Sequence, residues 1–288
     1  METTELLRKV RKIEIKTRGL SRRIFAGEYH SAFKGRGMSF SEVREYQYGD
    51  DVRNIDWNVT ARSGHPHVKV FEEERELTML LLVDTSQSVF FGASGQMKHE
   101  LIAELCAVLA FSAANNNDKV GLLLFSDRIE CYLPPQKGGN HILRIIETLV
   151  NVRPTGRGTN LKLALEYFQQ LVKRRCICFL LSDFWGQDYE QPLRIAARRH
   201  DLIALHVHDS LEASLPDIGL VCMRDAETGQ LLWVDTTDAA TRNDFYRRFE
   251  QHRQFCRQFF PRLGADYLAV RTGEDYALAL HQFFLKRM

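Results

Sequence analysis

From Leu77 onward, short apolar runs rich in β-forming residues alternate with stretches of helical period, and this alternation restricts the possible folds most strongly. The runs are almost continuously apolar, which is typical of strands covered on both faces rather than on one. The predicted strands are 77–83, 119–125, 175–181, 201–207 and 265–270. The sequence therefore predicts the α/β class, with a doubly wound, mostly parallel sheet and helices on both of its faces.

Helices are expected between these strands and after the last of them. Their approximate ranges are 96–115, 141–151, 161–172, 189–199 and 274–286. The first is nearly all apolar and should be central and buried. Two short runs, 220–224 and 230–234, predict an inserted β-hairpin, followed by a long polar helix near 237–262. We expect residues 1–75 to form an N-terminal extension packed on the core. Residues 76–288 would form the α/β domain, with the inserted hairpin and helix at about 212–262.

The charge balance argues against a protein that depends on phosphate attraction. Lys and Arg number 39 and Asp and Glu 37, a net charge of +2. Residues 8–23 are locally basic, but they match no nucleic-acid motif, so a nucleic-acid partner is not expected. The uncharged stretch 105–117 ends in three asparagines and is shorter than the roughly 18 apolar residues of a membrane span. With no apolar signal region after the N-terminus, we expect a cytoplasmic protein without a membrane partner.

Oxygen-bearing side chains follow the first strand, where Asp84, Ser86 and Ser88 form a D-x-S-x-S loop. Open α/β sheets bind ligands at the carboxyl ends of their strands. Two further loops, carrying Thr159 and Asp183, should return to the same edge. Carboxylate and hydroxyl oxygens suit Mg²⁺ or Mn²⁺. One Asp-x-Ser alone would indicate a helix N-cap, but three loops in this order predict a single metal site. We expect both aspartates to lie on loops that contribute little to the core.

This arrangement resembles a metal-ion-dependent adhesion site, and residues 77–207 resemble a von Willebrand factor type A domain. Asp84, Ser86 and Ser88 occupy all three positions of the first motif. Gln87 and Val89 stand where many members have Gly and Met, which leaves the ligands unchanged. In that family an acidic residue of a partner completes the metal's coordination. The resemblance therefore implies a Mg²⁺-dependent contact point for another protein.

The segments 35–40, 43–57 and 60–62 resemble the signature of the family called domain of unknown function 58, and the two resemblances together cover about residues 35–209. The resemblance implies a MoxR-type AAA+ ATPase as partner and a chaperone-like adaptor role in the maturation or assembly of a client protein. The sequence contains no Gly-x-x-x-x-Gly-Lys-Ser/Thr loop, so the partner would supply any ATP hydrolysis. Alternating arginines and acids, among them Arg44 and Asp50, are interpreted as a structural charge network.

Two function classes follow from the same loop. The first is a non-enzymatic, metal-dependent protein-interaction module. The alternative is a Mg²⁺-dependent phosphohydrolase in which Asp84 is the nucleophile and Asp183 holds the metal. That chemistry requires a second acid two residues after the first, but position 86 is Ser, and no lysine stands in an obvious supporting loop. A serine hydrolase is excluded because there is no Gly-x-Ser-x-Gly sequence.

Overall fold

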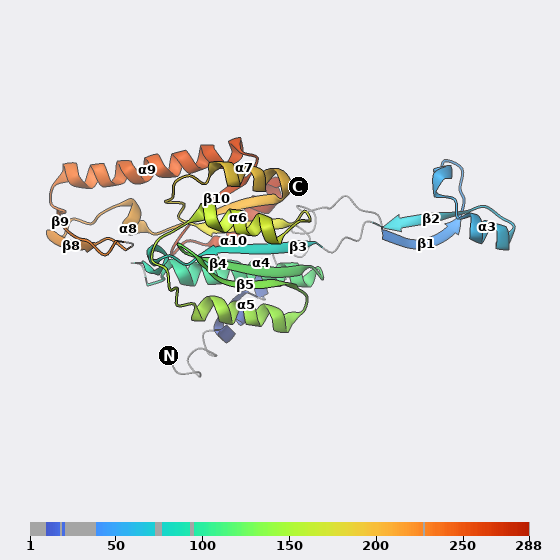
Figure 1. Ribbon diagram of the computed structural model, residues 1–288, viewed down its shortest axis with the longest axis horizontal. Coiled ribbons are helices and arrows are strands. Elements are labelled where there is room, and N and C mark those ends of the chain that lie inside the picture. Colours follow the sequence, from blue (N-terminus) through green and yellow to red (C-terminus); the bar gives the residue numbers. More distant parts are fainter. Residues whose placement is uncertain are drawn as a thin grey trace. The chain divides into compact units, whose positions relative to one another are not determined.

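The computed structural model (Figure 1) describes residues 10–17, 19–20, 39–72, 77–92, 95–226 and 228–287. The chain divides into two units, one formed by Met1–Ala32 with Thr78–Met288 and the other by Phe33–Leu77. Residues 10–17 are helical and belong to the larger unit. Residues 8, 9, 18 and 21–23 of the basic segment 8–23 lie outside the described residues, and so do the motif residues 35–38. The packing of residues 1–75 on the core therefore stays a prediction.

A six-stranded sheet forms the centre of the larger unit, in the order β10-β7-β6-β3-β4-β5. The strands are β3 (Thr78–Asp84), β4 (Lys119–Phe125), β5 (Ile129–Gln136), β6 (Ile177–Ser182), β7 (Asp201–His208) and β10 (Asp266–Arg271). All neighbours are parallel except β4 and β5. The predicted fold class is confirmed, and each of the five predicted strands is present. Because β3 lies between β6 and β4, the loop after it opens at the middle of the sheet edge.

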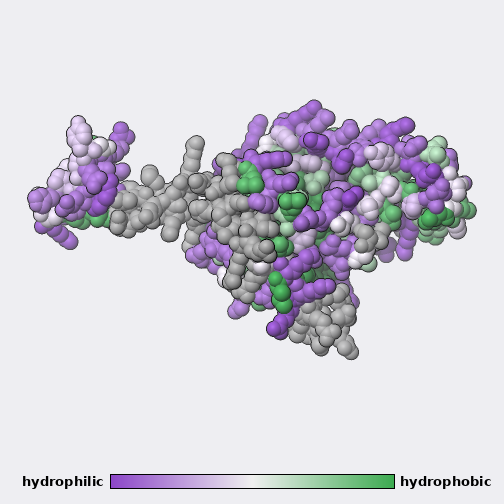
Figure 2. All heavy atoms as spheres, turned by 180° about the vertical axis from the view of Figure 1, so that it is seen from behind, coloured by the Kyte–Doolittle hydropathy of each residue, from purple (hydrophilic) through white to green (hydrophobic). Residues whose placement is uncertain are grey.

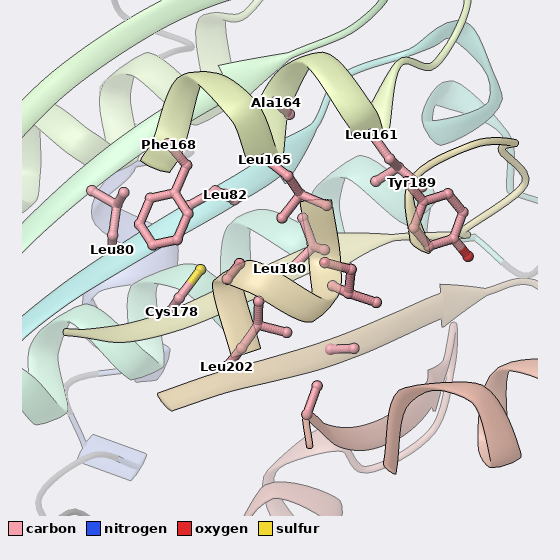
Figure 3. Packing of buried hydrophobic residues seen from close by; sticks show 14 of the residues in the cluster. Leu80, Leu82, Leu161, Ala164, Leu165, Phe168, Cys178, Leu180, Tyr189 and Leu202 are labelled. Carbon is pink, nitrogen blue, oxygen red and sulfur yellow. The ribbon is translucent and has the colours of Figure 1, made fainter. Parts of the chain in front are cut away.

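Helices cover both faces of this sheet (Figure 1). They are α4 (Lys98–Asn115), α5 (Gly139–Asn151), α6 (Leu161–Leu171), α7 (Glu190–Arg199), α9 (Ala239–Arg262) and α10 (Tyr276–Arg287). On one face, Phe168 and Leu165 of α6 pack over Leu80 and Leu82 of β3, as Figure 3 shows. Alternate residues of a strand point to opposite faces, so Leu81 points to the other side. Both faces of β3 are thus buried, which explains why its sequence is an almost continuous apolar run.

The helix α4 is central, as predicted, and 13 of its 18 residues are buried. It contacts β3, β4 and β7 and packs beside α5. Its burial follows from an almost uniform apolar sequence, which leaves no polar face for solvent. Among the described residues, no helix is both long and apolar enough to cross a membrane.

The edge strand β5 was not predicted. It contains Pro134 and Pro135, which remove backbone donors and are tolerated only at a sheet edge. Its pairing with β4 is antiparallel and interrupted by two register irregularities. Gly121 of β4 permits this contact, because a Cβ atom there would lie 2.6 Å from a methyl of Leu80 and 2.9 Å from Pro135. The irregular edge therefore packs closely although its sequence lacks a strand pattern.

The predicted hairpin is confirmed as β8 (Leu220–Arg224) paired antiparallel with β9 (Leu231–Asp235). A short helix, α8 (Ser210–Ala213), precedes it, and α9 follows. The hairpin exposes large apolar side chains, which contribute to the green area at the right of Figure 2. Leu220, Leu231 and Trp233 are 64–67% exposed. Apolar groups gathered this way on a protruding hairpin are typical of contact surfaces rather than of solvated faces.

The smaller unit contains β1 (Ser39–Glu45) paired antiparallel with β2 (His67–Glu72), and the helices η1 (Val52–Asn54) and α3 (Trp57–Ser63). Arg44 binds Asp50 through two hydrogen bonds of 2.8 and 2.7 Å. Asp51 and Asp56 cap η1 and α3 by accepting backbone N–H bonds. Asp50, Asp51 and Asp56 therefore each stabilise the local structure of this unit, in line with the charge-network interpretation.

His200, at the end of α7, makes stability depend on pH. Its ring packs against Phe168 in a tilted arrangement, with ring centroids 4.6 Å apart, and contacts the Cys176 sulfur at 3.3 Å. Burial lowers the pKa of His200 to about 4. Unfolded histidine takes up a proton near pH 6.5, so between these values the unfolded state binds more protons and stability falls as pH falls. We expect the natural chain to lose about 2 kcal/mol more than His200→Gln between pH 7 and pH 4.5. Urea unfolding at both pH values measures this, and parallel losses would contradict the burial of a neutral ring.

Candidate metal centre

Asp84 is the last residue of β3, and its side chain is completely buried. One carboxylate oxygen, Oδ1, accepts a 2.9 Å bond from the Ser86 backbone N–H, and the other, Oδ2, accepts a 2.6 Å bond from the Ser182 hydroxyl. Ser182 ends the neighbouring strand β6, so the two strand ends are joined through Asp84. This corrects the expectation of a loop residue that contributes little to the core.

Ser86 and Ser88 continue from Asp84 toward the surface. Their hydroxyl oxygens lie 3.0 Å apart, and Ser88 also hydrogen-bonds the carboxylate of Asp183. Ser86 is buried, whereas Ser88 is partly exposed. Four of the five predicted site residues therefore form one hydrogen-bonded set that reaches the surface at Ser88.

Asp183 follows β6 and is 3% exposed, so it too is a core residue rather than a surface loop residue. The next residue, Phe184, has a φ of +59°, a strained value for a side chain of this size. Phe184 is buried against Phe260, with ring centroids 4.6 Å apart, and this packing holds the turn. The backbone carbonyl of Asp183 accepts a 2.9 Å bond from the His252 ring of α9. The position of Asp183 is thus fixed by the core behind it.

The two buried carboxylates repel each other. Burial and the neighbouring charge of Asp183 raise the pKa of Asp84 to about 7. For Asp183, burial is outweighed by Lys98 and by the Ser88 hydrogen bond, which together lower its pKa. A divalent cation would relieve this repulsion, and hard oxygen donors suit Mg²⁺ or Mn²⁺. No three His, Cys, Asp or Glu side chains of the described chain are grouped for metal binding, so the site would depend on its serine hydroxyls.

The loop of Thr159 lies against the D-x-S-x-S loop. The Gln87 N–H donates to the Arg157 carbonyl at 3.2 Å, and the Asn160 N–H donates to the Ser126 carbonyl at 2.9 Å. Gly156 allows this approach, because a Cβ atom there would lie 2.2 Å from the Ser126 hydroxyl oxygen. The structure therefore brings the loop to the predicted edge, with Thr159 partly exposed like Ser88.

Lys98 is the site residue that the sequence reasoning missed. It begins α4, is 1% exposed, and donates to Asp183 at 3.1 Å and to Glu212 at 2.5 Å. Burial disfavours its charge, but the two carboxylates outweigh this effect and raise its pKa. A cation at a helix N-terminus opposes the helix dipole, and this was the one sequence signal of a special role. Lys98 also connects the site to α8, which carries Glu212.

Lys98 bears on the phosphohydrolase alternative as well. A lysine does support one of the two carboxylates, so that objection to the alternative was wrong. The other objection holds, because position 86 is a serine whose hydroxyl bonds Ser88. An acid that could protonate a leaving group is therefore missing two residues after Asp84.

Comparison with known proteins finds similar sequences and similar solved structures. At 33% identity over 268 residues, the chain matches the uncharacterized proteins Rv1480 of Mycobacterium tuberculosis and Mb1516 of Mycobacterium bovis, covering 92% of this chain and 84% of each relative. Similar solved structures are BatB from Bacteroides thetaiotaomicron (16% identity, TM-score 0.47, 73% of this chain and 98% of that one) and the SpRpn10 VWA domain (9%, 0.41, 72% and 95%). Residues 42–255, which include every loop of the candidate site, match the family described as protein of unknown function DUF58, and the chain belongs to that family.

Proposed function

We propose that this chain is a non-catalytic protein-interaction module that binds Mg²⁺ or Mn²⁺ and, through the metal, an acidic side chain of another protein. One observation carries the proposal: two buried carboxylates, Asp84 and Asp183, belong to a hydrogen-bonded set with two serine hydroxyls that opens at Ser88. Asp84, Ser86, Ser88, Thr159 and Asp183 would hold the metal. Some contacts would pass through water, because Mg²⁺ gives up its hydration shell reluctantly.

The bound cation would supply positive charge and an exchangeable coordination position. Both carboxylates are deep, whereas Ser88 and Thr159 are partly exposed, so an incoming ligand would approach from their side. A metal ringed by two carboxylates and neutral hydroxyls keeps net positive charge, which favours an Asp or Glu over a neutral group. Binding to the partner should therefore require the metal.

The DUF58 resemblance supports a more specific role, as a cytoplasmic adaptor acting with a MoxR-type AAA+ ATPase. The ATPase would supply ATP hydrolysis, and the adaptor would contact a client protein during chaperone-like maturation or assembly. The buried apolar environment of α4 and β3 provides a rigid support for such a contact. In this arrangement the chain would recognise the client protein, and the ATPase would supply the energy of ATP hydrolysis.

Capture of a purified MoxR-type ATPase from the same organism tests the proposal. We expect capture by the immobilised chain in Mg²⁺, and a loss of at least about tenfold in EDTA or with Asp84→Ala, because one carboxylate of the metal set is then missing. Asp244→Ala is the matched control, since Asp244 is exposed on α9 and pairs only with Arg248 among the described residues. Circular dichroism confirms that each variant is folded.

Equal capture under all these conditions would show that the partner uses another surface. A phosphoester screen with Mg²⁺ separates the alternative function. Turnover that disappears in Asp84→Asn would favour the phosphohydrolase over the interaction module, since a nucleophile cannot be replaced by an amide.

A further inference from the structure

A pocket of about 270 Å³ lies beside the candidate metal loop. Three parts of the larger unit form it. Gln87 stands between Ser86 and Ser88, and Arg157 belongs to the Thr159 loop. The turn of the β8–β9 hairpin contributes the rest, namely Arg224, Ala226 and Gly229. The inserted hairpin, which the metal site itself does not require, thus reaches the rim of that site.

Two arginines line the pocket, and no acid is among the described residues that line it. Arg157 and Arg224 are exposed, and neither guanidinium forms a hydrogen bond or ion pair with any part of the chain that the structure describes. Their backbones are nevertheless fixed: the Arg157 carbonyl accepts from Gln87, and Arg224 pairs with Leu231 in the hairpin register. The nearby Asp127 already receives the Arg128 guanidinium at 2.9 Å. Two arginines on well-held backbone at one small pocket therefore favour an anion from outside.

We propose that Arg157 and Arg224 bind a second carboxylate of the acidic segment whose first carboxylate reaches the metal. This inference rests on the proposed function and makes it more specific. The partner would be recognised by two acidic residues, one at the metal and one in the arginine pocket. A planar guanidinium binds a carboxylate through two parallel hydrogen bonds, which adds direction to charge attraction. The hairpin would then be the element that selects a doubly acidic segment over a single acid.

Fluorescein-labelled peptides test this by fluorescence anisotropy in Mg²⁺. The probes are Gly-rich hexapeptides to octapeptides with two Asp residues separated by one to three Gly, and the same peptides with one Asp changed to Asn. We expect the best two-acid peptide to bind about tenfold more tightly than its one-acid partner, the usual effect of one charge-assisted contact. Arg157→Ser or Arg224→Ser should remove this advantage and leave the one-acid affinity within about twofold.

Matched variants separate the possible outcomes. Arg144→Ser removes an exposed arginine of α5 and should leave both affinities unchanged. Asp84→Asn should weaken the binding of both peptides if a peptide carboxylate binds the metal. If it does not, while the arginine variants still lose the two-acid advantage, the metal proposal fails and the pocket remains. An undiminished advantage in Arg157→Ser and Arg224→Ser would overturn the pocket proposal. So would an oligodeoxythymidine that competes more strongly than the peptides and depends on the same arginines, because the ligand would then be a phosphate chain.

Discussion

Replacing Asp84 with asparagine is expected to weaken Mg²⁺ binding by at least about 100-fold, since even groups that only support a metal ligand change affinity by 10–100-fold. The same change should stabilise the metal-free protein by about 1–3 kcal/mol, because it removes a buried charge that repels Asp183. Asparagine can keep its oxygen toward the Ser86 N–H and donate its amide to the Ser182 hydroxyl. Shape and hydrogen bonding are thus largely retained while the charge is lost.

The fluorescence of Trp185 should report metal binding directly. Trp185 is half exposed, stacks on His252 with ring centroids 3.7 Å apart, and follows Asp183 by two residues. In a Trp57→Phe/Trp233→Phe background it is the only tryptophan. Its fluorescence should change on titration with Mn²⁺ or Mg²⁺. Unfolding in urea with EDTA gives the stability.

Asp244→Asn is the control for charge removal at the surface and should change neither quantity. Two results would contradict the site. One is an unchanged Mn²⁺ titration in Asp84→Asn, and the other is a metal-free variant less stable than the natural chain. The second would mean that the carboxylate is held for its hydrogen bonds alone.

The fold could be predicted because the strands are buried on both faces. In β3, every residue from Met79 to Asp84 is buried, and all but the last are apolar. The edge strand β5 escaped prediction for the opposite reason: only Leu133 of its eight residues is buried, and two are prolines. An edge strand pairs with only one neighbouring strand, so its residues need not form the continuous apolar pattern by which a buried strand is predicted.

The candidate site could be placed but not fully described. Asp84 and Asp183 were located because each follows an apolar run, the second with Ser182 between, and the ends of parallel strands meet at one edge. Their depth was not predicted, because burial depends on elements such as α9, whose His252 contacts the Asp183 carbonyl from 69 residues away. Lys98 was missed for the same reason. Its partners stand 85 and 114 residues along the chain.

Replacing Lys98 with methionine is therefore the variant expected to destabilise the protein most. Methionine fills much of the lysine's volume but leaves Asp183, which is 3% exposed, without its cation. Breaking a buried ion pair by removing one partner costs about 3–5 kcal/mol, because the remaining charge is uncompensated. We expect a loss of that size in urea unfolding with EDTA. Lys162→Met, at an exposed position of α6, is the matched control and should change stability little.

Magnesium should reverse part of that loss. Lysine and metal would both neutralise Asp183, so the protein without Lys98 has more to gain from the cation, and we expect its Mg²⁺ affinity to rise by about tenfold. Lys98→Met/Glu212→Gln should lie between the single variant and the natural chain in EDTA, because it removes one of the two stranded carboxylates. If Lys98→Met unfolded in EDTA at the same urea concentration as the natural chain, the ammonium group of Lys98 would not be compensating the charge of Asp183. If Mg²⁺ stabilised Lys98→Met no more than the natural chain, lysine and metal would not share that carboxylate, and the cation would have to bind elsewhere.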